Sequence, residues 1–299
     1  MKYLTLLILL ISTSFLAQSQ NSNYHNNRIA ISADGNNQAD NLHFWPRADP
    51  DDWGGTPFAL AIIAKKKLHN KLVHYSYNNF IDSPAHTSDI NQMEIGVDGA
   101  IKRWNFDKTK FFDVTEEYNK ARGHLVNEIA KSTAADPLFF LHMGPAEFFY
   151  RVVKQVIADG NIESLAHVTI ISHSGYNDNH LRRGDPKFDK KPVLAKNSHH
   201  KLEDVMALSG NRLKYIRITD QNVKWDVNQG WNSGKDWTVW HWMKNHKDKN
   251  IAWIYKRMEE HPEKVADASD AGLVYYLVTG DENATPLKLK QFFGTGINL

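Results

Sequence analysis

The chain reads Asp49-Pro50-Asp51-Asp52-Trp53-Gly54-Gly55-Thr56-Pro57 and then enters an apolar segment, Phe58 to Ala64. The apolar segment predicts a buried helix over Trp53–Leu68, and acidic residues suit the positive N-terminal end of a helix. One capping Asp would serve that purpose. Three carboxylates in four residues repel one another unless a cation or a polyol ligand shares them. The stretch therefore favours a ligand site over a plain helix cap with solvated acids.

A fourth carboxylate, that of Asp34, follows the apolar segment Arg28-Ile29-Ala30-Ile31-Ser32-Ala33. Within it we predict a strand over Ile29–Ala33, after which Gly35–Ala48 leads to the acidic helix start. Ligands of open α/β sheets bind at the carboxyl ends of the strands. A strand that ends in Asp, followed by an acidic helix start, therefore predicts an oxygen-rich cation site at that edge.

Strand-length apolar runs alternate with segments of helical period along the rest of the chain. Further strands are predicted at Leu72–Tyr77, Pro137–His142, His167–Ser172 and Leu213–Thr219, and further helices at Val114–Ser132, Pro145–Ala158 and His199–Ser209. Continuous apolar strands are typical of a parallel sheet that is covered on both faces. We therefore expect a single α/β domain with a doubly wound, mostly parallel sheet. The long stretches Asn78–Phe112 and Asp220–Asp236 would leave its ligand edge, and loops of that length tend to be functional.

The composition and the start of the chain exclude several classes of protein. Residues 1–19 combine a lysine, a short apolar core and small residues, which predicts a cleavable signal peptide, and residues 20–27 predict a loose polar leader before a catalytic domain at 28–299. No later apolar stretch has the length of a membrane span, so we expect a secreted or periplasmic protein without a membrane partner. The chain has no Cys, which excludes disulfides and thiolate chemistry. Its Lys and Arg residues are spread out, which argues against a nucleic-acid polymer as partner.

The order of polar residues after successive strands resembles the nucleoside hydrolase superfamily, of the inosine-uridine-preferring type, over most of the mature chain. The resemblance rests on four places: Asp34 with Asp49-Pro50-Asp51-Asp52, Asn78-Asn79, Met143-Gly144-Pro145-Ala146-Glu147, and Ser269-Asp270 before an apolar helix. It implies a nucleoside hydrolase-like fold with its active site at the carboxyl edge of the sheet.

The resemblance also implies a Ca²⁺ site with Asp34, Asp52, Asp270 and the main-chain carbonyl of Met143 as ligands. Asp34 would in addition be the base that activates water, and Asp51 would bind sugar hydroxyls. The chain departs from the family in two ways. The acidic loop of the family is contiguous, whereas here it is interrupted, so Asp49 is an alternative to Asp34. The His that assists the leaving group in many members is Ser269 here.

Further substrate contacts are expected from other polar and aromatic residues at this edge. Asn78 and Asn79 are similar to the family's Gly-Asn, and Asn177 and Asn179 lie in a segment that loosely resembles its Asn and Glu stretch. Trp231, like Trp225, lies among Asp, Asn and Gly, which predicts an exposed ring that stacks on a sugar or base. The neighbouring His199 and His200 do not predict zinc, because adjacent helix residues point apart.

The residue types at this edge also suit glycosidic-bond hydrolysis without reference to the family. Hydrolysis of a glycosidic bond passes through an oxocarbenium-like state. A hard cation can bind the sugar diol and lower the pKa of a water, whose proton a neighbouring Asp then takes. Help for the departing group must come from elsewhere, from His173, His180 or His241, of which we select His173.

The expected function is Ca²⁺-dependent hydrolysis of the N-glycosidic bond of a small nucleoside or similar glycoside. Two alternatives stay open: hydrolysis of another glycoside or oligosaccharide on the same fold, and sugar binding without catalysis. The oligomeric state, including a homo-oligomer, is also open.

Overall fold

A computed structural model describes residues 24–35, 49–79, 81, 90–179, 199–222 and 230–297. Within these residues six strands form a central sheet in the order β3-β2-β1-β4-β5-β6, and every neighbouring pair is parallel. The predicted α/β class and doubly wound parallel sheet are confirmed. The strands are β1 (Arg28–Ala33), β2 (Leu72–Tyr77), β3 (Phe111–Asp113), β4 (Leu138–Met143), β5 (Val168–Ser172) and β6 (Lys214–Arg217).

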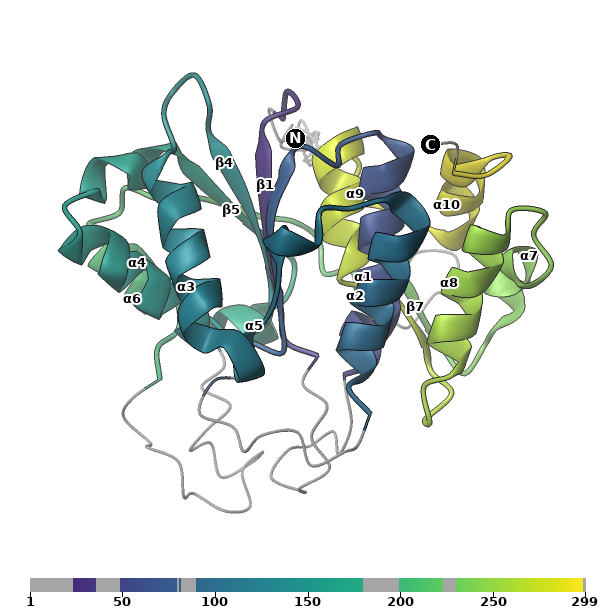
Figure 1. Cartoon of the computed structure of the whole chain (residues 1–299). Helices are drawn as coiled ribbons and strands as arrows, with labels where there is room; N and C mark the ends of the chain where they lie inside the picture. The colour runs from purple at the N-terminus through teal and green to yellow at the C-terminus, as the bar shows by residue number, and fades with distance from the viewer. Residues whose placement is uncertain are drawn as a thin grey trace, which may run out of the picture.

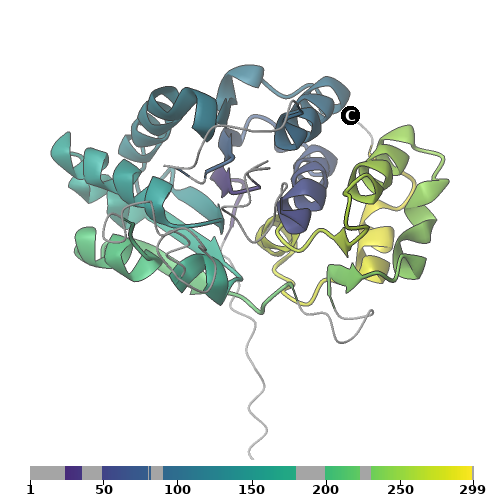
Figure 2. The same cartoon turned by 90° about the horizontal axis from the view of Figure 1, so that it is seen from below.

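Helices cover both faces of this sheet (Figures 1 and 2). On one face lie α3 (Val114–Ala130), α4 (Glu147–Ala158) and α6 (Leu202–Leu208); on the other lie α1 (Pro50–Lys65), α2 (Gln92–Trp104), α8 (Lys249–Glu259) and α9 (Ala271–Thr279). Ala30 belongs to the core of the first face, whereas Ile29 and Ile31 belong to that of the second. Because successive strand residues face opposite sides, both kinds of position in the middle of β1 are apolar, although Arg28 and Ser32 in the same strand are polar and buried.

Smaller elements complete the described chain. The helix α5 (Gly175–Asn179) follows β5, and α7 (His241–Lys244) and α10 (Pro286–Phe293) flank α8 and α9 in sequence. The short strands β7 (Asn232–Gly234) and β8 (Ala266–Asp267) pair antiparallel. Short 3₁₀ helices form η1 (Lys108–Lys110), η2 (Ile162–His167) and η3 (Thr238–Trp240).

The structure corrects one expectation about the stretch between β2 and β3. We predicted few regular elements over residues 78–112, yet α2 and the start of β3 lie there. The buried residues of α2 are Met93, Gly96, Val97, Ala100 and Trp104, which follow the spacing of three and four that marks one helix face. Glycine and charged residues at the intervening positions weaken this apolar spacing in the sequence.

The predicted signal peptide and most of the leader, residues 1–23, lie outside the described residues. Tyr24 packs edge-on against Phe139 with ring centroids 5.4 Å apart, and its hydroxyl donates to the carbonyl of Asn27 at 3.1 Å. Tyr24 therefore contacts the sheet, whereas His25 and Asn26 are exposed. In the part of the chain that the structure describes, no helix combines the length and apolarity needed to cross a membrane.

Two histidines join the sheet to α3. The Nδ1 atoms of His74 in β2 and His124 in α3 are 3.1 Å apart, and the ring of His74 also stacks on Phe112. One ring must donate a proton to the lone pair of the other, which two protonated rings cannot do. Burial lowers the pKa of both histidines, and the charge of His124 lowers that of His74 further.

We expect the free energy of unfolding to fall as the pH drops below about 6.5, the ordinary pKa of His in the unfolded chain. Below that pH the two histidines of the unfolded chain bind protons, whereas in the folded protein His74 and His124 bind them only at a lower pH. Urea unfolding at about pH 7.5 and about pH 5.5 measures this loss. His74→Phe, which keeps a ring beside Phe112, should lose less stability over that interval.

The charges that face His124, those of Asp107, Lys110, Glu128 and Lys131, are the same in the wild type and the variant. The comparison therefore isolates the histidine pair. An identical loss of stability in both proteins would show that the pair does not titrate as described.

Candidate metal and catalytic site

The chain order of the sheet reverses between β1 and β4. From β1 the chain moves outward to β2 and β3, and it returns on the other side of β1 at β4. Such a reversal leaves a crevice at the carboxyl ends of the two strands, where α/β proteins bind ligands. Asp34 directly follows β1, and its amide donates to the carbonyl of Met143, the last residue of β4, at 3.1 Å. Two of the predicted site segments therefore meet in the crevice.

Three buried carboxylates converge at this point. Asp34, Asp52 in the first turn of α1 and Asp270 just before α9 each offer one oxygen, and these oxygens lie within 4.8 Å of one another. We call these residues the Asp trio. The amide of Gly35 donates to Asp34 Oδ1 at 3.0 Å and to Asp52 Oδ2 at 2.8 Å, which fixes two of the carboxylates. The predicted convergence is therefore present, and it includes Asp34 rather than the alternative Asp49.

Two glycines bring α1 close to the segment that carries Asp270. A Cβ on Gly54 would lie 2.0 Å from the backbone oxygen of Asp267, and one on Gly55 would lie 3.2 Å from Asp270 Cβ. No side chain fits at the first position without separating the two segments. The Gly-Gly pair next to the acidic residues thus allows the third member of the trio to reach the other two.

Crowding raises the pKa values of the site carboxyls. Burial, followed by the charges of Asp34 and Asp270, raises the pKa of Asp52 well above its usual range. Burial and then the charge of Asp49 do the same to the pKa of Asp51, and burial raises the pKa of Asp267 to about 7. Each carboxylate makes its neighbours harder to ionise, so the site favours the arrival of positive charge.

His173, which follows β5, contacts the trio from outside. Its Nε2 lies 2.9 Å from Asp270 Oδ1, and its Nδ1 lies 3.4 Å from Asp220 Oδ1 and 3.3 Å from the amide nitrogen of Gln221. Burial disfavours the charged ring, but the hydrogen bonds and charges of Asp220 and Asp270 outweigh it and raise the pKa of His173 to about 9. Both ring nitrogens are engaged, which favours a role in orienting Asp270. Its predicted help to a leaving group stays a prediction.

The two asparagines after β2 make different contacts. Asn79 donates from Nδ2 to Ser32 Oγ at 2.9 Å, and a Cβ on Gly144 would lie 2.8 Å from Asn79 Oδ1 and 2.9 Å from the amide nitrogen of Asp34. Asn79 Oδ1 therefore lies beside the trio. Asn78 is buried and donates to Asp113 Oδ2 at 2.8 Å, so its amide ties the end of β2 to the end of β3.

Asp51 lies at the rim of the site and is only half-buried. Its Oδ1 accepts the amide of Asp52 at 3.0 Å, and its Oδ2 lies 3.5 Å from Asn222 Nδ2. This placement leaves its predicted contact with sugar hydroxyls open. On α5, Asn177 is buried, and the exposed Asn179 donates to the carbonyl of Gly175 at 3.0 Å, which uses the amide within the helix itself.

The prediction of an exposed Trp231 is wrong. Its side chain is 0% exposed and packs edge-on against Phe58 and Tyr275. The polar neighbour that suggested exposure, Asn232, is itself buried and donates to Asp267 Oδ2. Trp225 and His180 lie outside the described residues. His200 bonds through Nδ1 to Glu147 Oε2 at 2.8 Å.

Two acids at the site, Asp220 and Asp267, were not predicted from the sequence. Asp267 accepts the amide of Ser269 at 3.0 Å, and this Asp-x-Ser turn is a local signal that marks it. Asp178, which accepts hydrogen bonds from Ser172, Tyr215 and Arg217, was not predicted either. The partners of Asp178 come from separate strands, so no local pattern marks it.

Comparisons with known proteins give one relative. No family model matches the chain, and no solved structure gives a significant match. The chain is similar to the uncharacterized protein P22 of Formosa agariphila, with 28% identity over 271 residues that cover 86% of this chain and 85% of that protein. This likeness assigns neither a family nor an activity.

Proposed function

We propose that this chain is a hydrolase of glycosidic bonds, of nucleoside hydrolase type, that works with a divalent cation at the Asp trio. One observation carries the proposal: three buried carboxylates from distant segments converge at the point where the strand order reverses. Ca²⁺ is the first candidate for the ion. The proposed substrate is a small nucleoside or another glycoside, and we expect the protein that acts on it to be exported.

The chemistry of the site fits a hard cation, which prefers carboxylate and carbonyl oxygens. Asp52 Oδ1 and Asn79 Oδ1 are buried and have no hydrogen-bond partner among the described residues, so both suit a further contact. The carbonyl of Met143 accepts the amide of Asp34 and keeps a second lone pair. The trio would hold the ion together with Asn79 Oδ1 and the carbonyl oxygen of Met143.

When bound, a divalent cation would supply the positive charge that binds the sugar diol and lowers the pKa of a water. Asp34, as a member of the trio, would take the proton of that water. Asp51 at the rim would bind and orient the sugar through its hydroxyls. His173 would hold Asp270 in position, and the burial of the trio would keep bulk water away.

The proposal is tested by assaying the chelator-treated protein against nucleosides, simple glycosides and oligosaccharides, with and without added Ca²⁺. We expect hydrolysis of at least one class that disappears with the chelator and returns with the ion. Turnover of oligosaccharides alone would support the second candidate, a glycosidase with another substrate. Sugar binding without turnover under every metal would contradict a hydrolase, and activity that survives complete metal removal would contradict the role of the ion.

A further inference from the structure

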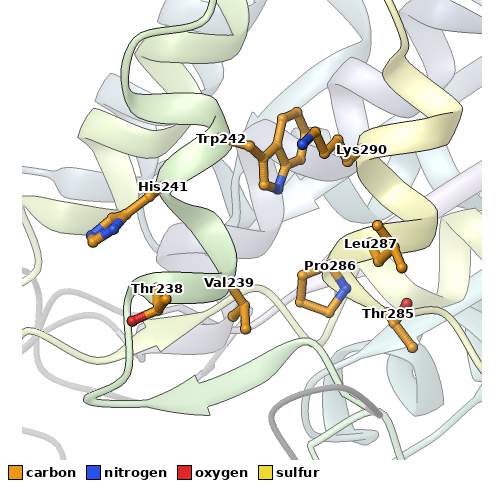
Figure 3. Close-up of a pocket in the computed structure, with 8 residues that line it drawn as sticks. All are labelled: Thr238, Val239, His241, Trp242, Thr285, Pro286, Leu287 and Lys290. Carbon is orange, nitrogen blue, oxygen red and sulfur yellow. The ribbon is translucent and has the colours of Figure 1, made fainter.

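A pocket lies between residues 238–242 and the start of α10 (Figure 3). Its volume is about 640 Å³, which falls within the range of about 300–1,000 Å³ that is usual for small-molecule sites. It is lined by Thr238, Val239, His241, Trp242, Thr285, Pro286, Leu287 and Lys290. None of these residues belongs to the Asp trio or to the groups that bond to it.

Part of the lining is apolar and presents an aromatic ring. In Figure 3 the indole of Trp242 and the side chain of Lys290 lie at one end of the pocket, and Val239, Pro286 and Leu287 lie toward the other. Leu287 is 63% exposed, so its apolar side chain is accessible to a ligand in the pocket. The indole nitrogen makes no hydrogen bond with the described residues, so packing alone sets the position of the ring.

The polar part of the lining supplies hydroxyls and a cation. The hydroxyl of Thr285 accepts the amide of Lys288 at 3.1 Å and can still donate to a ligand, and Thr238 is exposed. An aromatic face beside hydroxyl groups suits a sugar ring, whose C–H face packs on the indole while its hydroxyls form hydrogen bonds.

The charges around the pocket select an anionic ligand. Lys290 is exposed and forms no ion pair with the described residues, and no acidic side chain is among the described residues of the lining. The neighbouring cation on α10, Lys288, is already paired, because its Nζ donates to Asp281 Oδ2 at 2.7 Å. Lys290 is therefore the cation that a ligand carboxylate or sulfate would meet.

We propose that this pocket is a binding site for an acidic sugar, separate from the Asp trio. The sugar ring lies against Trp242 and Leu287, and its anionic group pairs with Lys290. The site does not depend on the hydrolase activity proposed above. A protein with both sites would hold one acidic residue of a saccharide while another part of the same or a second molecule reaches the trio.

The test uses three matched probes, methyl glucoside, methyl glucuronoside and methyl glucoside 6-sulfate, which differ only at one carbon. Binding to the full-length protein is followed through the ¹H–¹⁵N signal of the Trp242 indole, assigned with Trp242→Phe. We expect the acidic probes to bind about tenfold more tightly than the neutral one, and Lys290→Gln to remove that preference. The two acidic probes distinguish a carboxylate from a sulfate.

Lys256→Gln is the matched control, because it removes an exposed cation on α8 that does not line the pocket. It should leave binding unchanged, whereas Trp242→Ala, which lacks the reporter indole and is followed by calorimetric titration, should weaken the binding of all three probes more than Trp242→Phe does. Equal binding of neutral and acidic probes, equal effects of Lys256→Gln and Lys290→Gln, or no binding of any probe would each overturn the proposal.

Discussion

Asp52→Asn should abolish cation binding and at the same time make the metal-free protein more stable. The loss of affinity should be at least about a hundredfold, because groups that merely orient a metal ligand already contribute about 10- to 100-fold. The gain in stability has a separate cause. Burial and the charges of Asp34 and Asp270 oppose the ionised form of Asp52, and an amide removes that charge. The amide oxygen can still accept the bond from Gly35 that Asp52 Oδ2 now accepts at 2.8 Å.

Two measurements on chelator-treated protein check this result: calorimetric titration with Ca²⁺ and thermal unfolding with and without the ion. The wild type should be stabilised by Ca²⁺. The variant should unfold at the same temperature with and without Ca²⁺, and that temperature should be higher than that of the metal-free wild type. Asp98→Asn is the control, since that side chain is half-exposed and forms only a surface ion pair with Lys108. A variant that binds Ca²⁺ like the wild type, or that is less stable without it, would contradict the assignment of the trio.

Gly54→Ala should damage the protein more than any other single methyl group added to α1. The new Cβ would lie 2.0 Å from the backbone oxygen of Asp267, so α1 and the segment before α9 must move apart. Overpacking of this kind costs about 1–3 kcal/mol of stability, and here the clash is with backbone, which yields least. The same displacement carries Asp270 away from Asp34 and Asp52, so cation binding should be lost with it.

Gly123→Ala provides the matched comparison, since Gly123 is in the middle of α3 and a Cβ there would meet nothing within 4 Å. That change should stabilise the protein by about 0.5–1 kcal/mol, because Ala suits a helix interior better than Gly. Urea unfolding of both variants gives the two stabilities. If Gly54→Ala kept the wild-type stability and affinity, the close approach of the two segments would not be what assembles the trio.

Sequence patterns predicted the elements that carry strong periodicity or continuous apolar runs. β1, β2, β4 and β5 lie within about a residue of their predicted bounds, because a parallel strand buried on both faces is mostly apolar. The Asp residues that follow or precede such elements could be placed at one edge of the sheet by topology alone. The resemblance to a known family then selected Asp34, Asp52 and Asp270 from the other acids.

The parts that could not be predicted depend on partners distant in sequence. Trp231 has polar neighbours in the chain, but its burial is decided by Phe58 and Tyr275. The contacts of His173 with Asp220 and Asp270 could not be expected either, because both partners lie far from it along the chain. For the same reason the sequence could not show that Asn78 and Asn79 lie differently. Asn78 joins the ends of two strands, whereas Asn79 faces the trio.

The trio also joins the first strand of the described chain to one of its last helices. An ion shared by Asp34 and Asp270 would act as a removable cross-link that closes almost the whole polypeptide into a single loop. Closing a long loop restricts the unfolded chain more than closing a short one, so such an ion would stabilise the native state largely through the entropy that it takes from the denatured one. Uptake of the ion would then report that both ends of the fold have come together.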